Sequence, residues 1–160
     1  MSKSDTFEND LLLLLFNNTA IANIGDVAGL RATTTAGTFW LSLHTADPGE
    51  AGSEITNETA YTAYARQAVN RASGAGGFTV TGSSVSPTTN TDFPECTAAP
   101  GGPITHFGIV NTASGAGKLL YSGTMTPNVT MAVGVAPRVK YTSTVVEDYL
   151  QGRKSTTARG

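Results

Sequence analysis

The chain has 160 residues, which is enough for one ordinary domain with its own core. Only 14% of the residues are charged, well below the usual level of about a quarter, and a net charge of −2 gives no overall basic field for nucleic acid. The single cysteine, Cys96, excludes an intrachain disulfide and a metal site built on several thiolates, and it fits folding in a reducing cytoplasm. A polar but weakly charged surface of this kind suits a protein that packs side by side in an assembly.

The N-terminal residues predict a short helix over Thr6–Phe16. Asp5 is its expected N-cap, Glu8 the capping-box partner, and Asn17-Asn18 its expected end. Leucines on all sides indicate that the helix is buried or faces a partner subunit, and the interface candidates are Leu11, Leu12, Leu14 and Leu15. The apolar run is too short to cross a membrane, and the acidic residues before it do not fit a secretory signal.

Residues 19–37 are small and polar and are expected to form a loop, after which the hydrophobic period changes to two. Short strands are predicted over residues 38–45, 64–71, 78–81, 83–86, 91–94, 104–110, 119–126, 129–135 and 139–146. This spacing is typical of an antiparallel β-sandwich or a jelly-roll-like barrel. We therefore predict a mainly β fold in three segments: a helix and loop arm (1–37), a β-sandwich domain (38–146) and a basic C-terminal arm (147–160).

The first predicted strand has two distinct faces. Phe39, Leu41, Leu43 and Thr45 alternate with the opposite-facing set Thr38, Trp40, Ser42 and His44. Core packing is the default role of a tryptophan in the middle of a strand. The sequence Asp47-Pro48-Gly49 predicts the turn that ends this strand, because aspartate accepts local backbone N–H bonds and glycine tolerates a positive φ.

Two histidines, His44 and His106, lie on predicted strands. A metal site that combines them with Asp47 or Asp92 is conceivable. No HxH or HExxH spacing supports such a site, so hydrogen-bonded structural histidines are the favoured interpretation.

Catalysis has two further candidate arrangements in the sequence. Cys96 and His106 would form a nucleophile and base, but no flanking motif supports them. A glycosidase would need two acids in a cleft lined by aromatic side chains, and the candidates are Asp47, Glu50, Glu54, Glu58 and Asp92. Several of these acids lie in turn-forming sequence, where carboxylates are commonly solvated. We therefore expect no enzymatic activity, no catalytic residue, no bound metal and no cofactor.

Arg66 is predicted to have a structural role. An arginine that follows Tyr64 on a strand is able to stack on an aromatic ring and to bind a carboxylate across the sheet. Asp47 or Glu54 would be a suitable partner. Such a contact would fix a loop in place and would not take part in catalysis.

The C-terminal stretch is basic and contains no acid after residue 150. Two interpretations are open: a solvated tail, or an arm that docks on an acidic neighbour. If it is an arm, its contact residues are Arg153, Lys154 and Arg159.

An ordered set of motifs extends along most of the chain, from Phe7 to Val146. The motifs occupy Leu41–Gly52, Glu54, Tyr64–Val69, Thr91–Pro94, Ile104–Ile109 and Leu119–Gly123. Together they resemble a widespread family of small virion proteins of tailed phages, often labelled tail fibre or putative structural protein. The resemblance implies a β-sandwich subunit of the particle with no catalytic residues. The segment after Val146 looks longer than the family requires, which favours an arm that reaches a neighbouring subunit.

The resemblance gives two expectations for function. The first is a capsid decoration, or cement, protein that binds the major capsid protein and stabilises the head shell. The alternative is a tail or tail-fibre component that attaches to the host or anchors a receptor-binding protein, with the loops 48–59 and 95–103 facing outward. In both cases the protein would be made in the bacterial host cytoplasm and act in the virion. We expect a dimer or trimer that contacts other virion proteins and neither nucleic acid nor a membrane.

Overall fold

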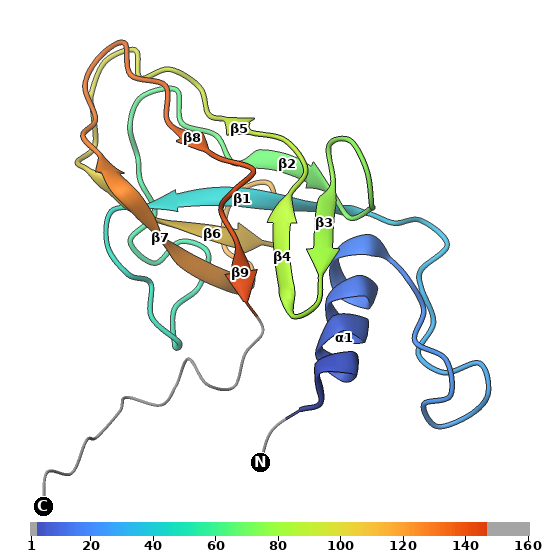
Figure 1. The fold of residues 1–160 in the computed structure, drawn as a ribbon. Helices are drawn as coiled ribbons and strands as arrows, with labels where there is room; N and C mark the ends of the chain where they lie inside the picture. Colours follow the sequence, from blue (N-terminus) through green and yellow to red (C-terminus); the bar gives the residue numbers. More distant parts are fainter. Residues whose placement is uncertain (1–2, 147–160) are drawn as a thin grey trace, which may run out of the picture.

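The computed structural model describes residues 3–146 and confirms a mainly β, antiparallel fold with one short N-terminal helix (Figure 1). Among the described residues the sheets stay open and no closed barrel is found. The elements, in chain order, are α1 (Asp5–Asn17), β1 (Thr38–His44), β2 (Gln67–Asn70), β3 (Phe78–Thr81), β4 (Ser84–Pro87), β5 (Thr91–Asp92), β6 (Ile104–Val110), β7 (Leu119–Val129), β8 (Arg138–Val139) and β9 (Val145–Val146).

The largest sheet has the strand order β2-β1-β6-β7, and every neighbouring pair is antiparallel. The strand β1 lies inside this sheet, where it pairs with β2 at its start and with β6 along its second half. As predicted, Leu41 and Leu43 are buried in the apolar core. The opposite face is buried as well, because Ser42 and His44 have no exposed surface. The end of β1 is therefore enclosed on both sides.

Two smaller sheets complete the fold. In one, β3 and β4 form a hairpin to which β9 adds as a third strand; in the other, β5 pairs with β8. The helix α1 contacts the β3–β4 hairpin and lies beside it in Figure 1. Phe16 at the end of this helix is fully buried and makes edge contacts with Phe39 of β1 and Phe78 of β3. The aromatic cluster thus joins the helix to both the large sheet and the hairpin.

The helix begins one residue earlier than predicted. Its N-cap is Ser4, whose hydroxyl accepts a bond from the backbone N–H of Phe7 at 3.4 Å, so Asp5 is the first helical residue and not the cap. Its end is as predicted: Asn18 has the left-handed conformation, and its N–H donates to the carbonyl of Leu13. No basic residue lies in the last turn of the helix. Arg71 instead donates to its terminal carbonyls, those of Leu14 and Leu15.

Several predicted strands have different bounds. The expected strand 64–71 begins only at Gln67, because residues 61–64 form a turn in which Ala63 has a positive φ. The strand β7 continues to Val129, and the expected strand over 129–135 is irregular, with a turn at Gly134. The expected strand over 139–146 is divided into β8 and β9 by the turn that starts at Lys140.

Trp40 is not a core residue, contrary to the prediction. It is half-buried and does not belong to the apolar cluster. Trp40 shares its face of β1 with Ser42 and His44, and the chain covers this face fully at Ser42 and His44 but only partly at Trp40.

The predicted interface residues on α1 have different environments. Leu12 is buried in the core and Leu11, Leu14 and Leu15 are partly covered. Arg153, Lys154 and Arg159 lie outside the described residues, and the division into three segments stays a prediction. Within residues 3–146 no helix is long and apolar enough to cross a membrane.

Candidate functional site

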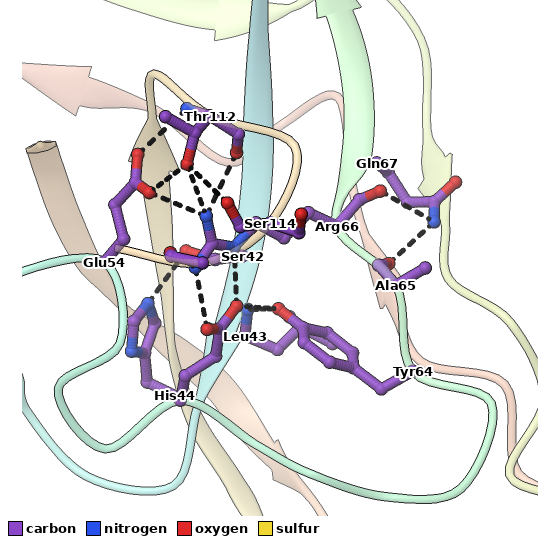
Figure 2. A network of polar contacts seen from close by, with 12 residues as sticks. Ser42, Leu43, His44, Glu54, Tyr64, Ala65, Arg66, Gln67, Thr112 and Ser114 are labelled. Atoms are coloured by element: carbon purple, nitrogen blue, oxygen red, sulfur yellow. Dashed lines mark hydrogen bonds and ion pairs between the residues drawn. The ribbon is translucent and has the colours of Figure 1, made fainter. Parts of the chain in front are cut away.

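The most extensive polar network in Figure 2 is centred on Arg66, which immediately precedes β2. Its side chain is only 2% exposed and binds two carboxylates. One guanidinium nitrogen, Nη1, lies 2.7 Å from Glu54 Oε2, while Nε and Nη2 lie 2.7 and 2.8 Å from the two oxygens of Glu58. Such a bidentate geometry is the strongest form of arginine–carboxylate pairing.

The β6–β7 loop supplies the remaining contacts of this cluster. Arg66 donates to the carbonyl and hydroxyl of Thr112, both at 3.0 Å, and to the carbonyl of Gly115 at 2.9 Å. Glu54 in turn accepts bonds from the backbone N–H groups of Asn111 and Thr112, at 2.7 and 2.9 Å, and from the Thr112 hydroxyl. We call Glu54, Glu58, Arg66 and Thr112 the Arg66 cluster. It joins three chain segments, those around residues 54–58, 66 and 111–115.

The environment of the cluster raises the pKa values of both Arg66 and Tyr64. The hydrogen bonds that Arg66 donates to Glu58 are the main cause of its raised pKa, with Glu54 adding to the effect against the opposing influence of burial. Tyr64 donates its hydroxyl proton to Glu58 at 2.8 Å and accepts the backbone N–H of Leu43 at 3.1 Å. Burial, followed by the nearby charge of Glu58, raises the pKa of Tyr64. The arginine therefore stays charged and the tyrosine stays neutral at physiological pH.

A second buried polar group lies beside the cluster, at the end of β1. His44 Nδ1 is 2.9 Å from the carbonyl of Thr56, and Nε2 is 2.8 Å from the hydroxyl of Ser42. Because a carbonyl only accepts, Nδ1 carries the proton and Nε2 accepts from Ser42. Burial lowers the pKa of His44. Gly108 of β6 faces this pair, and a Cβ there would lie 2.6 Å from the Ser42 oxygen.

The residues considered for a metal or catalytic site lie in different parts of the described structure. His44 and His106 lie opposite each other on β1 and β6, but no three histidine, cysteine or acidic side chains gather as potential metal ligands within residues 3–146. Asp92 pairs with Arg138 on the separate β5–β8 ribbon. Cys96 is fully buried, with its thiol directed to backbone carbonyls of Ala98 and Ala99.

The predicted contact of Arg66 with a carboxylate is confirmed, and of the two alternative partners it is Glu54 that binds. The Asp47 carboxylate instead accepts the N–H of Gly49 at 2.9 Å and stabilises the predicted turn. The second partner, Glu58, was not identified from the sequence. Its spacing of four residues from Glu54 was a usable signal, since a turn between them brings both carboxylates to one side.

An open pocket of about 380 Å³ lies against the Arg66 cluster. Its walls come from residues 58–66 and from the tip of the β6–β7 loop at residues 113–115. The aromatic part of the wall is Tyr61 and Tyr64, whose rings meet edge to face with centroids 5.4 Å apart. The volume falls within the range of sites for small ligands.

Residues 2–147 match the family model described as "Podophage GP4 fiber I protein gp80". The chain belongs to this family. The match covers nearly the whole chain and all the described elements. It confirms the resemblance to phage virion structural proteins and places the protein in the virion, in a family of fibre proteins. No curated protein matches the chain.

Replacing Arg66 with alanine is expected to lower the free energy of unfolding by about 3–5 kcal/mol, because two carboxylates would be left without their cation in a buried site. Arg138→Ala is the matched control, since it breaks an arginine–aspartate pair whose side chains are more than half exposed. Urea unfolding followed by circular dichroism measures both. Equal, small losses in the two variants would show that the Arg66 cluster does not stabilise the fold.

His44 is expected to make the protein less stable as the pH falls below about 6.5, the ordinary pKa of histidine. Below that pH the unfolded chain binds a proton that the buried imidazole, with its lowered pKa, does not accept. The free energy of unfolding should therefore decrease on acidification, and His44→Gln should reduce this slope. Thermal unfolding from pH 7 to pH 5 tests this, and an unchanged slope in His44→Gln would contradict it.

Proposed function

We propose that this protein is a non-enzymatic fibre component of a podophage virion, which attaches to other virion proteins and takes part in host attachment or in anchoring a receptor-binding protein. The family match to a fibre I protein over residues 2–147 carries this proposal. It supports the tail-fibre alternative at least as well as the capsid decoration role expected first.

The buried network fits a structural role. Arg66 has five N–H groups, and each of them lies within hydrogen-bond distance of a protein acceptor. Both carboxylates of the cluster are bound to it, and Glu54 has no exposed surface. Groups held in this way position loops, whereas a general acid or base must reach its substrate. The arrangement supports a rigid subunit without catalytic chemistry.

The two ends of the described chain lie close to the same hairpin turn, so one surface could bring both to a neighbouring subunit. Asn9 of α1 donates to the carbonyl of Gly82 in the turn of the β3–β4 hairpin, at 2.8 Å. Ser84, two residues farther along, pairs with Val146 of β9. The N-terminal helix and the end of β9 therefore lie at the same end of the molecule (Figure 1). We propose this end, together with the partly covered Leu11, Leu14 and Leu15 farther along α1, as the surface that contacts a second copy or another virion protein.

A capsid decoration protein remains the second candidate. The low fraction of charged residues favours it, because many copies would have to pack side by side on a shell. Such a protein would contact the major capsid protein over the whole head. The two candidates differ in location and copy number, so imaging separates them.

Cryo-electron microscopy of intact virions that carry an epitope insertion beside Val27, decorated with an antibody fragment, tests the proposal. Val27 is 85% exposed and lies in a loop, so an insertion there should not disturb the core. Antibody density at the fibres is the expected result. Density over the head lattice would favour the decoration role, and virions that lack the protein altogether would contradict a structural role.

A further inference from the structure

The helix α1 has two apolar faces, and only one of them belongs to the described core. Leu12 and Phe16 are buried on the side that meets the β3–β4 hairpin. Phe7, Leu11 and Leu14 follow one another at spacings of four and three residues, so they share a second face, which we call the outer face of α1. Each of these three side chains is partly exposed, and none of them packs against the apolar core of the described residues. A row of exposed apolar side chains, unlike a single one, indicates a contact with another segment.

The outer face is acidic as well as apolar. Asp10 lies on it, three residues after Phe7 and four before Leu14. Asp5 adds an exposed carboxylate at the start of the helix. Residues 3–17 contain three acids and one lysine, a formal charge of −2. Arg71, at the other end of the helix, already donates to the terminal carbonyls. A complementary segment would therefore combine apolar side chains with positive charge.

The sequence that follows β9 has this composition. Residues 147–160 come after Val146 and lie outside the described part of the chain. From residue 149 onward the sequence contains no acid and has a formal charge of +3. Its large apolar and basic residues are Tyr149, Leu150, Arg153, Lys154 and Arg159. Both properties of the outer face thus have a counterpart in one short segment.

The end of β9 lies close to α1, and the segment after it is long enough to follow the helix. Val146 pairs with Ser84, and Asn9 of α1 donates to Gly82 in the same hairpin turn. Residues 149–160 would extend over up to about 40 Å. A helix of 13 residues such as α1 is about 20 Å long. Residues 149–160 therefore suffice to lie along the whole outer face of an α1 at this end of the molecule.

The direction of the chain favours the α1 of a second copy over that of the same copy. Asn9 lies at the turn after β3, whereas Phe16 packs on Phe78 at the start of β3, so α1 runs away from the turn (Figure 1). The strand β9 runs toward the turn, because it is antiparallel to β4. A segment that continues in this direction moves away from its own outer face and toward a copy that meets this end of the molecule. In a twofold pair, each copy would donate one segment and receive one.

We propose that residues 149–160 of a second copy lie along the outer face of α1, and that two copies exchange these segments. The inference rests on the proposed function, because it names the partner for the contact surface proposed there. Tyr149 and Leu150 would cover the apolar row, and the basic residues would pair with Asp5 and Asp10. Single exposed ion pairs contribute little, but the two exchanged segments bind together and their effects combine.

Reversal of charge in the full chain tests the exchange. One variant carries Arg153→Glu, Lys154→Glu and Arg159→Glu, and the other carries Asp5→Lys and Asp10→Lys. Each variant alone places like charges in both contacts, so the affinity of its dimer should fall by at least about tenfold. An equimolar mixture should form dimers again, because the acidic segment of one chain meets the basic helix of the other while the second contact keeps its native charges. Sedimentation velocity over a range of protein concentrations measures this, and circular dichroism confirms that each variant is folded.

Glu50→Lys combined with Glu95→Lys is the matched control. Both glutamates are exposed and lie on loops away from α1, so the same change of charge should leave the affinity of the dimer unaltered. A chain that ends at Asp148 keeps every described element and should be monomeric.

The outcomes separate this inference from the fibre proposal. A native chain that is monomeric at every concentration tested, or dimers that neither charge reversal weakens, would overturn it. Weakened dimers that the equimolar mixture does not restore would also overturn the exchange and would indicate that the segment binds its own helix. None of these results changes where the protein lies in the virion, which imaging decides independently.

Discussion

One guanidinium group organises this molecule outside its apolar core. Arg66 lies at the start of β2, yet its contacts extend to the segment after β1 and to the loop after β6. Two carboxylates and three loop acceptors surround a single buried cation, and removal of Arg66 would leave both carboxylates without their cation. Because breaking the cluster is costly, it fixes the positions of the segments that follow β1 and β6 relative to the start of β2.

The strand β1 shows how the core and the cluster depend on each other. One face contributes Leu41 and Leu43 to the apolar core, and the other buries Ser42 and His44 next to the loop that carries Glu54 and Glu58. The backbone N–H of Leu43 bonds to Tyr64, which bonds to Glu58, so the core strand and the cluster are directly connected. Gly108 allows the second face to close, because any larger residue would displace the Ser42–His44 pair. Tyr64 and Glu58 also line the pocket, so these hydrogen bonds hold that part of the pocket wall in place.

Local patterns were sufficient to predict much of the fold. The strand over 104–110 and the Asp47-Pro48-Gly49 turn have the predicted structure, because they depend on neighbours in the sequence. The half-buried position of Trp40 and the division of residues 139–146 were not predictable, since both depend on which face the rest of the chain covers. For the site, an arginine–carboxylate contact was foreseeable, and Glu54 was correctly named. The role of Thr112 was not, because it lies 46 residues from Arg66 and only the β6 pairing brings it close.

The central claim is that the Arg66 cluster holds the β6–β7 loop as firmly as the core holds the strands. Native-state hydrogen exchange at the backbone N–H groups of Asn111 and Thr112 tests it most directly, because both donate to Glu54 although Asn111 is exposed and Thr112 lies in a loop. The account predicts that these two groups exchange only with global unfolding, at the same free energy as the N–H of Leu43 in β1. Exchange at the rate of an unprotected surface loop would contradict it.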